Sequence, residues 1–489
     1  MQRLIDAIYK LFVRNDKQTA ARVPAPARAV AWIRAHESAR GGIVSGSDSG
    51  DGGVLATGAL LPTIFLYGEC DLGIRCLQWL LRKQQSDGSF RDSDARSAVL
   101  PSSYVLLGLL ATGRFSSDEV VDSARRVSEH LWRELVNPSL PDAIRPVLIW
   151  ALSTAGKLVD EPKYLESAAS FLEARVNSAR NGVARHLLGH ELTALIELDQ
   201  VDRARRMLQP LLDRQKASGA MALEGTSCVS SPVLGQLACC CYRLGEWAAG
   251  DKALAWLEKH QCPSGGFLGS YGWSASYYPN SEVASAVKWY LDAHRLRVQS
   301  AMARCALPST VALDDGRLHS VLRYINSRDR VVEVGCGKGR FLKAIRELRS
   351  EVSCTGVDIT PSLLAEIPDE ISRREGSLEC VPYPDGSFDV TFSIEAIEHS
   401  ANWEAAIREL SRITRPGGWV LIIDKPHSRW GRLECLSWEA WPDAHYLAQV
   451  LERYCDEVAY EPVGYDDTPA DGLMVLWKGR RRPLPAARS

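Results

Sequence analysis

The stretch VVEVGCGKGRF, residues 331–341, decides the fold of the second half of the chain. Its β-branched start predicts a strand, and Gly335, Gly337 and Gly339 allow the sharp turn that leads from a strand into a helix. The spacing is G-x-G-x-G, and Arg340 stands where a dinucleotide turn of the G-x-G-x-x-G type needs a small residue. The turn therefore predicts a cofactor site and disfavours a nicotinamide cofactor with its pyrophosphate.

Short strand-like runs alternate with helical spacing on both sides of this turn. The runs are RVVEVG, VSCTGVDI, SLECV, FDVTFSI, WVLIID and LMVLWKG. Strands separated by helices predict an α/β domain with a parallel sheet and helices on both faces. Asp358 ends the second run, roughly twenty residues beyond the turn, where a carboxylate can accept both hydroxyls of a ribose. Glu398 and His399 follow the fourth run, and ELSRITRPGGWVLII comes next.

These four elements, in this order, resemble the class I S-adenosylmethionine-dependent methyltransferases, whose typical run is E-H followed by L-x-R-x-x-R-P-G-G. The resemblance implies a Rossmann-like fold with a mostly parallel sheet, S-adenosylmethionine as the cofactor and S-adenosylhomocysteine as the product. One position departs from the family, because Ser377 stands where an Asp often receives the adenine amino group, and a hydroxyl is the weaker acceptor. The cofactor-binding residues that the resemblance implies are Glu333, Gly335, Cys336, Gly337, Gly339, Asp358, Ile359, Ser377, Leu378 and Ser393.

Candidates for chemistry follow the fourth and fifth strands, because ligands bind at the carboxyl ends of such sheets. Methyl transfer depends on positioning, and an alcohol acceptor must also lose its proton. His399 is the first choice for the base, since an imidazole works near neutral pH, and Glu395 and Asp424 are further catalytic candidates. Alternatively, the Glu398-His399 pair caps the next helix and walls the pocket.

The stretch DKPHSRWGRLECLSWEAW, residues 424–441, is rich in tryptophan. Its aromatic rings are expected either to form a stacking platform for a sugar or another ring, or to pack the substrate-side helix on the first half of the chain. The sequence predicts no metal site. The substrate-binding candidates are Lys425, His427, Trp430, Trp438 and Trp441.

Helix follows helix through the first half of the chain. Amphipathic helices that carry Trp32, Trp79 or Trp256 end in glycine and an apolar residue, and more apolar helices lie between them. Periods of roughly 45 to 50 residues predict helical hairpins that close into a ring. The segments around Trp79 and Trp256 resemble the repeats of the α/α toroids of terpene cyclases and protein prenyltransferases.

The resemblance to the toroids concerns architecture more than activity. The acidic clusters at residues 47–51 and 91–96 lack the Asp-rich spacing that cyclases use, and Cys228 and His260 make no convincing zinc set. The toroid is therefore expected to bind or to scaffold. Glu191, Glu224 and Glu282 are candidates for lining its mouth, or else they are helix caps and exposed charges.

Composition limits the class of protein. The chain has 489 residues and a formal net charge of −2, and this balance disfavours nucleic-acid binding, which needs a strongly basic face. The thirteen cysteines have irregular spacing without a C-x-x-C pair, which predicts buried free thiols and a cytoplasmic protein. No run approaches the roughly 18 apolar residues of a membrane span. The apolar side of residues 4–12 is expected to dock on the domain core or to touch a membrane surface.

The predicted organisation is multidomain. Residues 1–296 form an all-α toroid, 297–315 a linker, 316–480 the methyltransferase domain and 481–489 a basic tail. The predicted function is S-adenosylmethionine-dependent O-methylation of a glycan, a glycolipid or another small natural product, with the toroid as a substrate-binding or scaffold domain. The alternatives are a bifunctional enzyme whose toroid performs isoprenoid cyclisation or transfer, and a toroid that binds a protein partner. The oligomeric state is left open.

Overall fold

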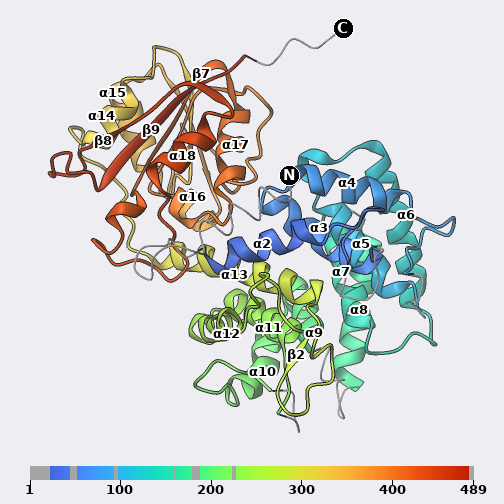
Figure 1. Cartoon of the computed structure of the whole chain (residues 1–489). Helices are drawn as coiled ribbons and strands as arrows, with labels where there is room; N and C mark the ends of the chain where they lie inside the picture. The colour runs from blue at the N-terminus through green and yellow to red at the C-terminus, as the bar shows by residue number, and fades with distance from the viewer. Residues whose placement is uncertain are drawn as a thin grey trace. The chain divides into compact units, whose positions relative to one another are not determined.

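A computed structural model describes residues 23–44, 52–92, 97–158, 161–178, 188–222 and 227–483. The described chain divides into two compact units, one of Arg28–Ala301 and one of Met302 onward together with residues 23–27 (Figure 1). Helix α13, Ala284–Arg304, continues into the segment expected to be a linker. The predictions on residues 4–12, 47–51, 93–96, Glu224 and residues 484–489 lie outside the described residues.

The first unit is helical. In chain order its helices are α2 (Ala25–Ala35), α3 (Val54–Leu66), α4 (Cys70–Leu81), α5 (Val99–Leu110), η1 (Gly113–Phe115), α6 (Asp118–Leu135), α7 (Arg145–Leu158), α8 (Pro162–Ser178), α9 (Leu188–Glu197), α10 (Val201–Leu212), α11 (Ser231–Leu244), α12 (Trp247–Lys259) and α13. A short antiparallel pair, β1 (Val229–Ser230) with β2 (Ser270–Tyr271), lies among them.

The helices of this unit alternate between two environments. Helices α3, α5, α7, α9 and α11 are buried along most of their length, and each contacts the next of this set. Helix α13 meets both ends of the series: the Thr63 hydroxyl of α3 donates to Asp292 (2.9 Å), and the Cys239 thiol of α11 donates to the Trp289 carbonyl (3.7 Å). Helices α4, α6, α8, α10 and α12 are more exposed, and each packs beside a buried helix.

The second unit is built on a seven-stranded sheet of order β5-β4-β3-β6-β7-β9-β8. Its strands are parallel except β9, which runs antiparallel to both of its neighbours. The strands are β3 (Arg330–Val334), β4 (Ser353–Asp358), β5 (Ser372–Glu375), β6 (Phe388–Ile394), β7 (Thr414–Asp424), β8 (Cys455–Val463) and β9 (Met474–Arg481). The helices are α14 (Gly316–Leu322), α15 (Arg340–Leu348), α16 (Pro361–Leu364), η3 (Ile397–His399), α17 (Trp403–Ile413), η4 (His427–Arg429) and α18 (Ala444–Leu451).

Each face of this sheet has its own apolar core. Val331 and the apolar residues of α14 and α15 belong to one cluster, whereas Val332 and those of α17 and α18 belong to the other. Because alternate residues of a strand point to opposite faces, β3 is buried on both sides from Val331 to Val334. The predicted α/β fold with a mostly parallel sheet is therefore confirmed.

Two strands differ from the sequence prediction. The prediction of a strand over SLECV is wrong, because the third strand of this sheet in chain order is β5, a few residues earlier. β5 lies at the edge of the sheet and all its residues are exposed, so it lacks the apolar pattern that marks a strand. Strand β8 was not expected, since it is the opposite edge and is mostly exposed as well.

Candidate functional site

The glycine-rich turn joins β3 to α15 and keeps its backbone close to the neighbouring strands. Gly335, Gly337 and Gly339 have φ values of 82°, 53° and 70°, the left-handed region that favours glycine. A Cβ on Gly335 would lie 2.4 Å from the Ala396 side chain, so this position has no room for a larger residue. The Gly337 N–H donates to Asp358 at the end of β4 (2.8 Å).

Asp358 is buried and organises the first two strand ends. Its Oδ2 accepts the Gly337 N–H, and its Oδ1 accepts the Thr360 N–H (2.8 Å). Burial raises the pKa of Asp358, and these backbone hydrogen bonds oppose the shift. A carboxylate has about four lone-pair positions, so the group keeps acceptor capacity for a further ligand.

Two buried oxygen atoms near the turn lack a hydrogen-bond partner among the described residues. They are Glu333 Oε2 at the end of β3 and Ser393 Oγ in β6. Burial raises the pKa of Glu333 well above its ordinary value, and Arg340 opposes this shift. Burial likewise raises the pKa of the Cys336 thiol, which is therefore uncharged. Buried polar atoms usually have hydrogen-bond partners. These two oxygens could therefore accept hydrogen bonds from donor groups of a bound cofactor, for example from its ammonium group.

The segment after β5 is held by a residue that the sequence prediction missed. The buried Glu379 carboxylate accepts hydrogen bonds from the Ser400 hydroxyl (2.7 Å) and the Ala401 N–H (3.1 Å). These bonds fix the neighbouring Ser377 and Leu378, both buried. A charged residue inside the apolar run SLECV was the available signal for this role.

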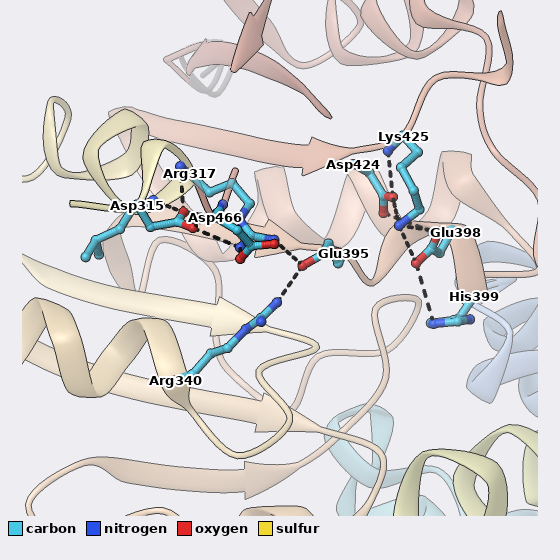
Figure 2. Close-up of polar contacts among 10 residues, drawn as sticks. Asp315, Arg317, Arg340, Glu395, Glu398, His399, Asp424, Lys425 and Asp466 are labelled. Carbon is cyan, nitrogen blue, oxygen red and sulfur yellow. Dashed lines mark hydrogen bonds and ion pairs between the residues drawn. The ribbon is translucent and has the colours of Figure 1, made fainter. Parts of the chain in front are cut away.

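Glu395, expected to be catalytic, is enclosed by arginines at the end of β6. Arg317 of α14 and Arg340 of α15 both donate to its Oε2 (Figure 2). Arg317 also binds Asp315 (2.9 Å) and Asp466 (2.7 Å), so one guanidinium joins three segments of the domain. This arrangement suits a positioning group better than a base, because two cations already occupy the carboxylate.

Asp424 ends β7, Lys425 follows it, and both form a second polar cluster with Glu398 (Figure 2). The Lys425 ammonium lies 2.7 Å from Glu398 Oε2 and 3.3 Å from Asp424 Oδ1. Burial lowers the pKa of Lys425, but the charges of Asp424 and Glu398 raise it more, so it lies above its ordinary value. Asp424 is fully buried and also accepts the backbone N–H groups of Lys425 (2.8 Å) and Glu398 (3.3 Å).

His399 lies between two carboxyl groups. Its Nε2 is 3.8 Å from Glu398 Oε1, and its Nδ1 is 4.0 Å from Glu439 Oε1. Burial lowers the pKa of His399 to about 4, so the ring is neutral near pH 7. Burial also raises the pKa of Glu398 and of Glu439. The sequence prediction missed Glu439, because forty residues separate it from His399 and only the fold joins them.

The tryptophan-rich segment, residues 427–442, covers this polar cluster. The Ala440 N–H donates to the Glu398 carbonyl (3.0 Å), which ties the segment to η3. Trp441 is buried and meets the exposed Trp430 edge to face, with ring centroids 5.2 Å apart. The His427 ring stacks near Trp430 at 6.3 Å. Trp430 therefore has an exposed ring, which packs against the buried Trp441.

Residues 332–422 match a protein family model described as a methyltransferase domain. This region is a class I methyltransferase domain. Its strand order, its glycine-rich turn and its buried acceptors agree with S-adenosylmethionine as the cofactor. The predicted enzyme class and cofactor are thus confirmed for the second half of the chain.

Characterised relatives of the methyltransferase domain act on different kinds of acceptor. Over 102 residues it is 34% identical to malonyl-[acyl-carrier protein] O-methyltransferase of Serratia marcescens, a match that covers 19% of this chain and 37% of the relative. Over 158 residues it is 26% identical to norajmaline N-methyltransferase of Rauvolfia serpentina, covering 29% and 52%. The chain therefore spans about half or less of these relatives' length.

A solved structure of geranyl diphosphate methyltransferase, in complex with geranyl diphosphate and sinefungin, is also similar to the methyltransferase domain. Its sequence is 13% identical, the match covers 38% of this chain and 99% of that chain, and the TM-score is 0.32.

The candidates in the first unit have structural partners. Glu282 accepts hydrogen bonds from the Trp32 indole and the Ser264 hydroxyl, and the His260 ring contacts the Trp256 carbonyl (2.7 Å). Glu191 is fully buried. All thirteen cysteines are free thiols, Cys228 among them. Within the described residues, no helix combines the length and the apolar character needed to cross a membrane.

Proposed function

We propose that this protein transfers a methyl group from S-adenosylmethionine to a small-molecule acceptor. The observation that carries the proposal is the turn after β3, which is locked to Asp358 and flanked by the unpartnered oxygens of Glu333 and Ser393. Glu333 and Ser393 would hold the methionine part of the cofactor, Asp358 the ribose, and Leu378 the adenine. When bound, the cofactor supplies the methyl group.

The proposed accepting atom is an oxygen. A hydroxyl must lose its proton, and His399 is the proposed base because its imidazole is neutral near pH 7. Its pKa of about 4 makes it a weak proton acceptor, so it needs the neighbouring carboxyl groups. The carboxyl groups of Glu398 and Glu439, on either side of the ring, would stabilise the imidazolium that forms. Lys425 and Asp424 fix the position of Glu398.

The proposed acceptor carries a ring, as in a glycan, a glycolipid or another small natural product. This part of the proposal is supported by Trp430, which is 47% exposed above the polar cluster and is backed by the buried Trp441. Aromatic faces of this kind bind the apolar faces of rings, while nearby polar groups orient them.

We also propose that the helical unit is an α/α toroid that binds or positions the acceptor. Support comes from the order of its contacts, which pass from α3 through α5, α7, α9 and α11 to α13 and back to α3. Each buried helix is paired with a more exposed one, in line with the inner and outer helices that the sequence repeats predict.

Calorimetry with S-adenosylhomocysteine tests the cofactor site without knowledge of the acceptor. The change Asp358→Ala removes a charged acceptor and frees the turn, so affinity should fall by roughly ten- to a hundredfold, since hydrogen bonds to charged groups contribute about 1.5 to 3 kcal/mol. Asp369→Ala is the matched control, because the Asp369 side chain is 93% exposed and its ion pair with Arg373 lies at the surface. Absence of binding by the unmodified protein would refute the proposed function.

A further inference from the structure

Among the described residues, one group of side chains has the composition and spacing of a metal site: Glu398, His399 and Glu439. One ligand atom from each lies within 4.8 Å of the other two. Two ligands that are about 2.1 Å from one ion lie roughly 3 to 4 Å apart. We propose that this group is a metal site that binds a hard divalent cation such as Mg²⁺ or Mn²⁺.

A second observation points to a ligand at this place. His399 Nδ1 is buried and has no hydrogen-bond partner among the described residues, although Glu439 Oε1 is 4.0 Å away. The two groups are thus close without touching. A metal-binding imidazole must offer a nitrogen with a free lone pair. His399 Nδ1 meets this geometric condition, because no described group occupies it.

The charges around the site also favour a cation. The carboxyl groups of Glu398 and Asp424 contact the Lys425 ammonium, and the carboxyl group of Glu439 lies 4.0 Å from His399 Nδ1, so three carboxyl groups and one ammonium gather here. The Lys425 ammonium contacts both oxygens of Glu398 (2.8 Å to Oε1 and 2.7 Å to Oε2). A carboxylate offers about four acceptor positions, however, so it can bind a metal ion and an ammonium together. Carboxylates suit Mg²⁺ and Mn²⁺, and one imidazole is compatible with them.

The backbone holds the ligands in place. Glu398 and His399 are adjacent in η3, and the Ala440 N–H, next to Glu439, donates to the Glu398 carbonyl (3.0 Å). The metal site is therefore built by two segments that a direct hydrogen bond joins. Binding of the ion does not depend on methyl transfer. A neutral imidazole that binds an ion through one nitrogen carries its proton on the other, so an ion at this site would take the place of His399 as the proposed base.

Electron paramagnetic resonance of the full-length chain titrated with Mn²⁺ tests the site. We expect one class of bound ion, with spin-echo modulation from a histidine nitrogen. Glu439→Gln and His399→Gln should each weaken binding at least about tenfold, the scale on which supporting groups affect metal affinity. Glu434→Gln is the matched control, because it makes the same chemical change as Glu439→Gln at an exposed position of the same segment.

Absence of Mn²⁺ binding, absence of nitrogen modulation in the unmodified protein, or equal losses in Glu434→Gln and Glu439→Gln would overturn the metal site. Calorimetry with S-adenosylhomocysteine on the same samples separates the two claims. A protein that binds S-adenosylhomocysteine and no Mn²⁺ loses only the metal site, whereas one that binds Mn²⁺ and no S-adenosylhomocysteine loses only the proposed function. Retained S-adenosylhomocysteine binding also shows that a variant is folded.

Discussion

Replacement of Arg317 by methionine should destabilise the second unit more than any surface arginine change. The Arg317 side chain is 3% exposed and binds Asp315, which is fully buried, as well as Glu395 and Asp466. Methionine fills similar space without charge, so the change leaves Asp315 as a buried carboxylate without its cation. Loss of one partner of a buried pair typically costs about 3 to 5 kcal/mol.

The lower end of that range applies here. Asp315 keeps the N–H groups of Arg317 (2.8 Å), Leu318 (3.3 Å) and Asp466 (2.8 Å), which partly solvate its charge. Asp466 is 72% exposed, so its own pairing adds little. We expect the free energy of unfolding to fall by about 3 kcal/mol, or roughly a hundredfold in the folded-to-unfolded ratio.

Hydrogen exchange read by mass spectrometry is the suitable assay, because it reports β3 and β6 separately from the helical unit. Arg323→Met is the matched control on α14, since the Arg323–Glu461 pair is exposed and should contribute less than about 1 kcal/mol. Equal acceleration of exchange in both variants at neutral pH would refute the reasoning.

The effect of Arg317→Met should depend on pH. Burial raises the pKa of Asp315, but the hydrogen bonds and charge of Arg317 outweigh it and bring the pKa below 3.8, the ordinary value. A carboxyl group whose folded pKa is depressed stabilises the fold above its unfolded pKa and loses that effect as the pH falls through the folded value. The difference between the two proteins should be full at neutral pH and should shrink as the pH falls toward the depressed pKa of Asp315 in the unmodified protein.

Two further predictions compare matched positions. Gly335→Ala should weaken S-adenosylhomocysteine binding in calorimetry at least about tenfold, because Gly335 has a positive φ and a Cβ there would lie 2.4 Å from Ala396. Gly431→Ala should leave binding unchanged, because a Cβ at Gly431 meets nothing within 4 Å. Equal effects of the two changes would contradict the steric argument. Trp441→Ala should lower the free energy of unfolding by about 3 to 5 kcal/mol, and Trp430→Ala by much less, because only Trp441 is fully buried; similar denaturation midpoints in urea would show that the burial argument fails.

Part of the candidate site could be predicted from the sequence because it is local. Gly335, Gly337 and Gly339 lie in one turn, and Asp358 ends the next strand, so spacing alone indicates a cofactor site. The structure adds the reason for this arrangement, since Asp358 accepts the Gly337 N–H directly. The assignment of Glu395 as a catalytic group could not be judged from the sequence, because its arginine partners come from α14 and α15.

The sequence by itself determined the helical first half, the α/β second half and the strand-turn-helix that holds the cofactor, because periodicity and glycine positions act within a few residues. Only the tertiary structure decided which distant side chains meet. Burial by several elements makes His399 neutral and brings Glu439 beside it, and it encloses Asp315 with Arg317. Desolvation depends on everything packed around a group, and no local pattern records that.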